Sequence, residues 1–477
     1  MRIVMSVLAA SVLVVSAGVT GCATNPVTGQ SQLSLVSESQ EIEMGRSQVP
    51  AVQQSMGFVA DPALQSYVST IGMKMARASE RPQLPWEFHV VDDPMINAFA
   101  APGGFIFVTR GILAVMNSEA ELAGVLGHEI AHVTAKHSVA QMSTGLGAQI
   151  GVLAAAILTK SDAVAQGAGA VATLFTLKYG RDQETQADAI GHRYALTERY
   201  DVREIPKTFM TLQRIGAASG SSSGPSFLST HPDPGNRVAK TQAWADTVSS
   251  YAGLVTDRDE FMTRINGMLY GADPAEGYFE NGVFLHPALR FQFNVPSNWL
   301  TANQKAAVVL GEPNGQAQIQ LSGVPQSSPQ AAMQAFQQQQ GIQTGNAQNI
   351  SLGGSPGMIA EFTAATQDGQ QIRGQVLMVQ HAGTVFQFVG YATAQGWGSQ
   401  GGTVSSVLRS FRPTASNQVF QRARALRVVT LQRATSIATL AQQSGGAIAT
   451  AELAILNGVD GDVTLPAGRR VKTVGYR

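Results

Sequence analysis

Residues 118–133 read SEAELAGVLGHEIAHV, and this stretch decides how the chain around it folds. Ser118 followed by Glu121 forms a capping box, in which the two side chains satisfy backbone groups at the start of a helix. Apolar residues then recur at the spacing of one helix face; they are Leu122, Val125, Leu126, Ile130 and Val133. The stretch therefore predicts a helix with one buried face.

The same helix carries His128, Glu129 and His132 in an H-E-x-x-H pattern. Residues four apart lie on one side of a helix, so the two imidazoles can bind one ion. Neutral imidazole is a good ligand for Zn²⁺, and a catalytic zinc site adds a third protein ligand and leaves one position for water. Glu129 is placed beside the metal without binding it, which suits a general base. The pattern predicts one Zn²⁺ per chain.

A second helix offers candidates for the third ligand. Residues 180–188 read GRDQETQAD, and Glu184 and Asp188 lie one turn apart on the same face of the predicted helix. Glu184 can complete the metal site, and Asp188 can accept the other ring N–H of a ligand histidine. Alternatively, both carboxylates lie on a solvated face and pair with Arg181 and Arg193. Spacing alone does not choose between these interpretations.

Taken together, four motifs resemble the family of HtpX and CAAX prenyl endopeptidases, which are gluzincin-type zinc metallopeptidases. The motifs are His128-Glu129-x-x-His132, Glu184-x-x-x-Asp188, Thr230-His231-Pro232 followed by Arg237, and the stretch Asn97 to Gly104. The resemblance covers roughly residues 25–247. The opening Asn25-Pro26-Val27-Thr28-Gly29 is similar to the lipoprotein branch of this family, which includes a periplasmic β-barrel assembly-enhancing protease.

The resemblance implies a role for each motif residue. Glu184 is the expected third ligand, Glu129 the general base, and Asp188 and Arg237 support the ligands from behind. The side chain of Asn97 and the backbone at Gly103 and Gly104 are expected to contact an extended substrate, although Asn97 could also be an ordinary turn residue.

His231 lies in a loop that two prolines stiffen, and two roles fit it. It can stabilise the oxyanion that forms on the substrate carbonyl, or it can bind the zinc ion itself and inhibit the resting enzyme. A structural histidine beside Pro232 is the third interpretation. We expect His137 and His192 to face solvent or to satisfy neighbouring groups.

The first residues have the features of an export signal. Met1 and Arg2 precede a mostly apolar stretch that ends in Val-Thr-Gly-Cys at residues 19–22, which resembles the lipobox of bacterial lipoproteins. Cys22 is the single cysteine of the chain, and we expect it to carry the lipid anchor. A remnant core cysteine is the alternative. Ala23 follows Cys22, which favours the outer membrane and a site facing the periplasm.

We expect a multidomain α+β protein. Its predicted parts are a signal peptide (1–21), a polar tether (22–36), a helix-rich zincin metallopeptidase domain (37–255), a smaller sheet-containing α+β domain (279–413) and a short βααβ module (424–477). The third folded part resembles a LysM module, although Gln432-Arg433-Ala434-Thr435 stands where that family has a Gly-Asp-Thr turn. The 279–413 domain has a pattern similar to the PsbP and Mog proteins.

Composition limits the partners. Lys plus Arg and Asp plus Glu are equal at 32 each, so we expect no nucleic-acid binding. We expect a membrane-anchored zinc metalloendopeptidase that cleaves unfolded or misassembled proteins of the cell envelope, in quality control. Two alternatives remain: a peptidoglycan-associated lipoprotein acting mainly as a chaperone or assembly factor, and a cell-wall peptidase.

Overall fold

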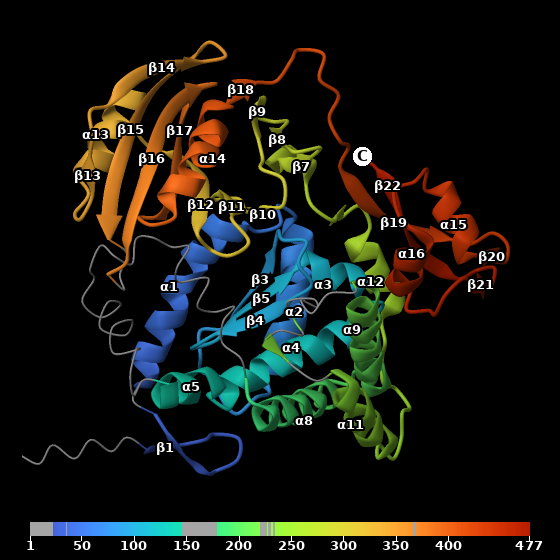
Figure 1. Cartoon of the computed structure of the whole chain (residues 1–477). Helices are drawn as coiled ribbons and strands as arrows, with labels where there is room; N and C mark the ends of the chain where they lie inside the picture. Colours follow the sequence, from blue (N-terminus) through green and yellow to red (C-terminus); the bar gives the residue numbers. More distant parts are fainter. Residues whose placement is uncertain are drawn as a thin grey trace, which may run out of the picture.

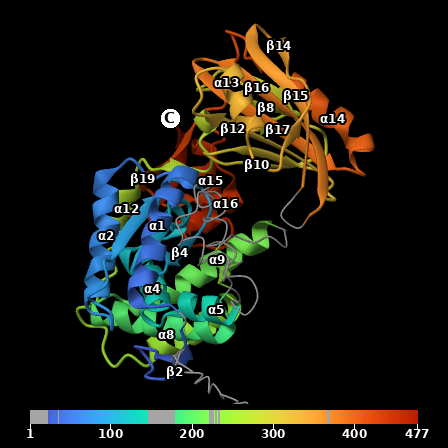
Figure 2. The same cartoon turned by 90° about the vertical axis from the view of Figure 1, so that its left-hand side faces the viewer.

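A computed structural model describes residues 22–34, 36–145, 179–219, 227, 230–231, 234–365 and 369–477. The predicted signal peptide, residues 1–21, lies outside these ranges. None of the helices in the described ranges has the length and apolar character needed to cross a membrane. The chain is mixed helix and sheet, with a helical region first and a sheet-rich region after it. The sheet-rich region stands above the helical region in both views (Figure 1 and Figure 2).

The helical region is built on a three-stranded sheet in the order β3-β5-β4. Strand β5 is parallel to β3 and antiparallel to β4, which therefore forms one edge. Alternate residues of a strand face opposite sides, so each face has its own core. Phe99 and Phe107 pack on Val52 of α1, whereas Ile106 and Val108 join the core that contains α4. The bounds are α1 (Glu38–Met56), α2 (Pro62–Arg77), β3 (Glu87–Val91), β4 (Ala98–Ala101), β5 (Phe105–Thr109) and α4 (Glu119–Thr134).

Further helices surround α4 on the side away from the sheet. Helix α8 runs along α4, and α9 and α11 pack on one another beside it (Figure 1). The bounds are α3 (Arg110–Val115), α5 (His137–Gly145), α8 (Arg181–Thr197), η2 (Val202–Glu204), α9 (Ile205–Ser219), α11 (Pro234–Asp246) and α12 (Arg258–Ile265). Because α4 lies between the sheet and these helices, every residue from Ala120 to Thr134 is buried.

A hairpin lies within the segment that we expected to be a polar tether. Strands β1 (Cys22–Thr24) and β2 (Ser31–Leu33) pair antiparallel. Asn25 follows β1, is buried, and donates a hydrogen bond from Nδ2 to the Ala135 carbonyl at 3.1 Å. This carbonyl follows the last turn of α4, where helix carbonyls lack partners within the helix. The segment is thus docked on the C-terminal end of α4.

The sheet-rich region has an eight-stranded antiparallel sheet and a four-stranded sheet in the order β18-β9-β8-β7. Helix α14 covers one face of the larger sheet, where Val404 and Leu408 meet Phe388. Helix α13 covers part of the other face, where Phe336 meets Phe362. The bounds in the larger sheet and its helices are β10 (Leu300–Asn303), β11 (Val308–Gly311), β12 (Ala317–Val324), α13 (Pro329–Gln337), β13 (Gln343–Thr344), β14 (Gln348–Leu352), β15 (Ser355–Ala365), β16 (Gln371–His381), β17 (Thr384–Thr393) and α14 (Trp397–Arg409). Those around the smaller sheet are η3 (Pro274–Glu276), β7 (Tyr278–Glu280), β8 (Val283–His286), β9 (Phe291–Asn294) and β18 (Arg412–Pro413).

The last segment has the βααβ order expected, with β19 paired antiparallel to β22. Its bounds are β6 (Leu269–Tyr270), which pairs with β19, then β19 (Arg424–Thr430), β20 (Thr435–Ser436), α15 (Ile437–Gln443), α16 (Thr450–Leu456), β21 (Thr464–Leu465) and β22 (Arg470–Tyr476). Leu426, Leu453 and Val474 belong to the same apolar core as α4. Lys472 is fully buried and donates hydrogen bonds from Nζ to the carbonyls of Ala114 at 2.8 Å and Met116 at 2.7 Å. The segment therefore shares its core with the helical region.

Candidate metal centre

Helix α4 places two imidazoles side by side. It begins at Glu119, and Ser118 accepts a hydrogen bond from the backbone N–H of Glu121, which is one half of the predicted capping box. The Nε2 atoms of His128 and His132 lie 3.0 Å apart, one helical turn from each other. Both side chains are buried.

Helix α8 brings carboxylates against the same pair because glycines allow the two helices to approach closely. A Cβ atom added at Gly127 would lie 2.8 Å from the Gly191 carbonyl oxygen, and one added at Gly191 would lie 2.7 Å from the backbone nitrogen of His128. Larger residues at either position would force the helices apart. Glu184 Oε1 lies 3.4 Å from His132 Nε2, and its Oε2 lies 3.6 Å from His128 Nε2. The interpretation of Glu184 as a solvated residue does not fit, because its side chain is buried.

His231 approaches the group from the segment after α9. Its Nδ1 lies 2.9 Å from Glu184 Oε1 and 3.2 Å from His128 Nε2. The ring of Phe227 stacks on its imidazole, with 4.5 Å between the centroids. One donor atom from each of His128, His132, Glu184 and His231 falls within a group in which all atoms are within 4.8 Å of one another.

The carboxylate of Asp188 lies behind His128, on the side away from the other ligand atoms. Its Oδ1 lies 2.9 Å from His128 Nδ1 and can accept that ring N–H. Arg237 holds this carboxylate in turn, donating from Nη2 to Oδ1 at 2.6 Å and from Nε to Oδ2 at 2.8 Å. Burial raises the pKa of Asp188, but the guanidinium of Arg237 and the ring of His128 outweigh burial, and the pKa is lowered. The carboxylate is therefore ionised and fixes the orientation of His128.

His137 supports His132, a contact that sequence reasoning missed. The chain leaves α4 through Lys136, whose φ of 57° is in the left-handed region, and this turn folds His137 back onto the site. The Nδ1 atoms of His137 and His132 lie 2.9 Å apart, and His137 Nε2 lies 2.7 Å from Gln186 Oε1. His137 is 2% exposed, so it does not face solvent. The sequence feature that could have predicted this contact is a histidine placed shortly after the H-E-x-x-H helix.

These partners fix the protons on both ligand rings. Asp188 accepts from His128 Nδ1, so a neutral His128 has a bare Nε2. Gln186 accepts from His137 Nε2, so the Nδ1 of a neutral His137 is bare and accepts the N–H of His132. The Nε2 of His132 is then bare as well. Burial lowers the pKa of His132 well below its usual range, which keeps this ring neutral.

The resulting donor set fits a zinc ion. Two bare imidazole nitrogens at 3.0 Å cannot hydrogen-bond to one another, and the Glu184 carboxylate points at both. Such converging lone pairs require a cation. Ligand atoms of a tetrahedral zinc site with bonds of about 2.1 Å lie about 3.4 Å apart, close to the separations of 3.0–3.6 Å between these atoms. The cluster can therefore bind Zn²⁺.

Glu129 lies next to this group, and its carboxylate forms no hydrogen bond with the described residues. The residue is fully buried, and neither carboxylate oxygen has a hydrogen-bond partner among the described residues. Its Oε1 lies 3.6 Å from His231 Nε2. Burial raises the pKa of Glu129, despite the opposing effect of His231 and His128. A carboxylate with a raised pKa is a stronger proton acceptor than an exposed one.

The predicted substrate-binding residues lie at the edge strand. Asn97 precedes β4 and is fully buried, and neither side-chain polar atom has a partner among the described residues. Gly103 and Gly104 turn the chain from β4 to β5 with φ of 78° and 109°. A Cβ atom on Gly103 would lie 2.5 Å from the Ile42 Cα, so this glycine also allows α1 to approach. Contact with a substrate stays a prediction for all three residues.

Comparison with known proteins identifies the helical region. The model of peptidase family M48 matches residues 62–245. The β-barrel assembly-enhancing protease of Yersinia pestis is 30% identical over 259 residues, which make up 52% of this chain and 52% of that protein. The mitochondrial metalloendopeptidase OMA1 of Schizosaccharomyces pombe is 36% identical over 187 residues, 37% of this chain and 52% of that protein. This chain thus spans about half the length of these curated relatives.

Solved structures give only a low similarity. The solution structure of cyanobacterial PsbP from Synechocystis sp. PCC 6803 is 14% identical, covers 28% of this chain and 91% of that one, and has a TM-score of 0.23. The Ran-binding protein Mog1p of Saccharomyces cerevisiae is 10% identical and covers 29% of this chain and 98% of that one, with a TM-score of 0.22. At such TM-scores the likeness supports no conclusion about residues 279–413.

Proposed function

Since residues 62–245 form a domain of peptidase family M48, we propose that this chain is a zinc metalloendopeptidase that hydrolyses peptide bonds of unfolded or misassembled envelope proteins. The observation that carries the proposal is the buried group of His128, His132 and Glu184 with the uncommitted carboxylate of Glu129 beside it. A metal site and a poised base are together the minimum for metal-assisted hydrolysis.

Each site residue has a role in this proposal. His128, His132 and Glu184 hold the zinc ion, and Asp188 with Arg237 orients the ring of His128. When bound, the zinc ion acts as a Lewis acid toward the scissile carbonyl and lowers the pKa of a nearby water. Glu129 removes the proton from that water and passes it to the leaving amine.

His231 has two possible roles, and its position supports the inhibitory one. Its Nδ1 lies within reach of the same point as the other donors, so it can fill the open position of the metal in the resting enzyme. In the metal-free protein its pKa is raised, because the carboxylates of Glu184 and Glu129 outweigh burial, so the ring would have to lose this proton before it could bind the metal. If the loop moved so that the ring turned toward a substrate carbonyl, the same ring could instead donate to the oxyanion.

In this proposal an extended substrate binds beside the edge strand β4. A peptide added alongside β4 would form backbone hydrogen bonds with it and pass over the metal site. Asn97 would then bind the substrate backbone, and the turn at Gly103 and Gly104 would border its path. The unpartnered amide of Asn97 supports this assignment, since a buried amide without partners is costly.

The envelope location rests on sequence features and on the similarity to a β-barrel assembly-enhancing protease. We assign Cys22 as the lipid anchor, the outer membrane as its location and the periplasm as the compartment of the site. The docking of Asn25 on the end of α4 supports a short connection between anchor and catalytic helix. The LysM-like segment extends the proposal to peptidoglycan as a possible partner.

The test of the proposed function is Glu129→Gln in the full chain. We expect one equivalent of zinc in the purified variant and in the wild type, and cleavage of unfolded casein by the wild type alone, inhibited by a chelator. Loss of the base without loss of a ligand should lower turnover by about two to four orders of magnitude. Full casein cleavage by the variant would refute the mechanism. His231→Ala in the same assay should raise cleavage if the ring inhibits and lower it if the ring donates.

A further inference from the structure

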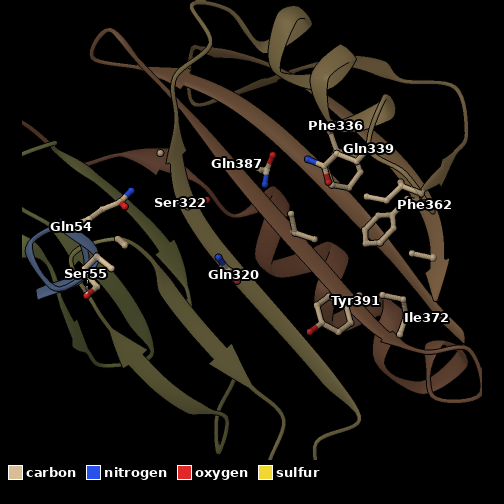
Figure 3. Close-up of a pocket in the computed structure, with 16 residues that line it drawn as sticks. Gln54, Ser55, Gln320, Ser322, Phe336, Gln339, Phe362, Ile372, Gln387 and Tyr391 are labelled. Atoms are coloured by element: carbon tan, nitrogen blue, oxygen red, sulfur yellow. Dashed lines mark hydrogen bonds between the residues drawn. The ribbon is translucent and has the colours of Figure 1, made fainter. Parts of the chain in front are cut away.

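A groove separates the helical region from the sheet-rich region. It has a volume of about 590 Å³, and its walls come from the C-terminal half of α1, from strands β12, β15, β16 and β17, and from the end of α13 with the segment after it. Figure 3 shows Gln54 and Ser55 of α1 across from the side chains that stand on the sheet. Helix α13 covers one part of this sheet face, and the groove is the part that α13 leaves uncovered.

The polar lining consists of uncharged groups. None of the residues that line the groove is Asp, Glu, Lys, Arg or His. Four of them are glutamines, and their side-chain amides form no hydrogen bond within the described part of the chain; they are Gln54, Gln320, Gln339 and Gln387. Each amide offers a donor and an acceptor, as does each peptide unit of a polypeptide. A neutral ligand with both kinds of group matches this lining.

The spacing of two of these amides suits an extended chain. Gln320 pairs in register with Val389, and Ser322 pairs with Gln387, so Gln320 and Gln387 are diagonal neighbours on one face. Diagonal neighbours on antiparallel strands lie about 7–8 Å apart. Alternate residues of an extended chain are about 6.6 Å apart, so adjacent outward peptide groups can reach both amides.

The apolar floor favours aliphatic side chains over sugars. Phe336 and Phe362 are each 4% exposed and meet edge to face, with centroids 5.4 Å apart. These two rings present little flat surface on which a sugar ring could stack, and Tyr391 is the one half-exposed aromatic ring of the lining. Ile372, Val389 and Tyr391 are half-buried and supply apolar contacts along the strands.

We propose that this groove binds an uncharged, extended segment of the polypeptide substrate at a distance from the metal centre. The proposal rests on the proposed function, because it assumes that the substrate is an unfolded protein. Helix α1 links the two places: Gln54 and Ser55 line the groove, while Val52 and Met56 pack on the sheet that contains β4. A long chain held in the groove remains near the catalytic domain, which raises its effective concentration there.

The test measures binding to the full chain carrying Glu129→Gln, so that no probe is cleaved. The probe is a labelled synthetic peptide of 12 residues, made only of Ala, Val, Gln and Ser. In the groove variant, Gln320→Glu and Gln387→Glu place two like charges on the sheet wall. The control variant carries Gln334→Glu and Gln371→Glu, which are exposed in the same region but do not line the groove. We expect Kd to rise about five- to tenfold in the groove variant and to stay unchanged in the control.

A second substitution and a second ligand complete the experiment. Gln54→Glu alters the α1 wall and should weaken binding in the same direction, which guards against misfolding of the sheet variant. Equal Kd values in the wild type, in the Gln320→Glu and Gln387→Glu double variant and in Gln54→Glu would overturn the proposal. Binding of a neutral chitin oligosaccharide in place of the peptide would also overturn it. Zinc content and casein cleavage of the wild type are measured separately, so a failure of the proposed function is seen independently of the groove.

Discussion

The two ligand histidines of α4 are one turn apart, yet opposite kinds of partner support them. His128 is backed by the ionised carboxylate of Asp188, which is itself held by Arg237. His132 is backed by the neutral ring of His137, which ends on the amide of Gln186. One side of the metal centre is charged and the other is an uncharged relay.

The Asp188 side and the His137 side of the metal centre should therefore affect zinc binding in different ways. A carboxylate behind a ligand imidazole makes the ring a more basic ligand and fixes its orientation. A neutral imidazole fixes the orientation while adding no buried charge. The neutral side therefore adds no charge to a buried group that already contains the carboxylates of Asp188 and Glu184 and the guanidinium of Arg237. We expect the charged side to dominate zinc affinity and the neutral side to set ligand geometry.

Among these variants, Asp188→Ala should weaken zinc binding most. The variant removes the acceptor of His128 and leaves the buried guanidinium of Arg237 with Glu184 as its remaining ion-pair partner. Breaking a buried ion pair costs about 3–5 kcal/mol, and loss of such a supporting group lowers metal affinity about 10–100-fold. Chelator competition and thermal unfolding check both effects. Asp188→Asn, which keeps an acceptor, should lose less, and wild-type zinc affinity in Asp188→Ala would contradict the assignment.

The next test is His137→Leu. It removes the acceptor for the His132 N–H without creating an unpaired charge, so we expect about tenfold weaker zinc binding, at the lower end of the range for supporting groups. His137→Asn is the matched control, because its side-chain oxygen can accept where Nδ1 did. Zinc affinity should recover in His137→Asn. Equal losses in both variants would mean that the ring acts by packing alone.

Acid should distinguish the two sides in the metal-free protein. Burial lowers the pKa of His137 below its usual 6.5, and the pKa of Asp188 is lowered from 3.8 despite burial, by Arg237 and His128. The unfolded state therefore binds more protons than the folded state just below each of these unfolded values. Stability from His137 is present above pH 6.5 and is lost as pH falls toward its folded pKa, whereas stability from Asp188 is lost only below pH 3.8.

The measurement is the free energy of unfolding between pH 7 and 5, by urea titration. Each titrating histidine contributes at most about 1.4 kcal/mol per pH unit. The slope should become shallower in His137→Asn and remain that of the wild type in Asp188→Asn. A shallower slope in Asp188→Asn alone would contradict the assignment of this pH dependence to His137.

Sequence reasoning reached the charged side of the centre but not the neutral side. In both the H-E-x-x-H helix and the Glu184–Asp188 helix, the functional residues are one helical turn apart, so the sequence alone places them on one face. His137 lies beyond the end of α4, and its contact depends on the backbone turn at Lys136, which no periodicity signals. Gln186 lies between Glu184 and Asp188 in the sequence, and nothing in that spacing indicates a contact with His137.

The domain pattern was predicted in the same partial way. The change to alternating residues near Phe291 correctly indicated a sheet-rich region. The βααβ order of the last segment was also legible, but its packing was not. Lys472 and Leu426 reach into the core of the helical region, and residues more than 300 positions apart in the chain carry these contacts. Local patterns contain no information on such long-range packing.

Substitutions of Gln186 should change zinc affinity least, and they test whether the neutral side acts through its hydrogen bonds. Gln186→Leu removes the acceptor at the end of the relay. The residue is only half-buried, so water can replace its amide, and we expect zinc affinity to fall by no more than about fivefold. Gln186→Glu converts the neutral side into a copy of the charged side, because a carboxylate would accept from His137 Nε2. The negative charge makes the relay a better donor of electron density to His132 and attracts the cation, so affinity should rise a few-fold. Opposite signs for Leu and Glu, measured by chelator competition at pH 7.5, would establish that the relay acts through its hydrogen bonds. A decrease in both variants would show instead that the site requires the amide for packing, and the two sides would then differ in shape rather than in charge.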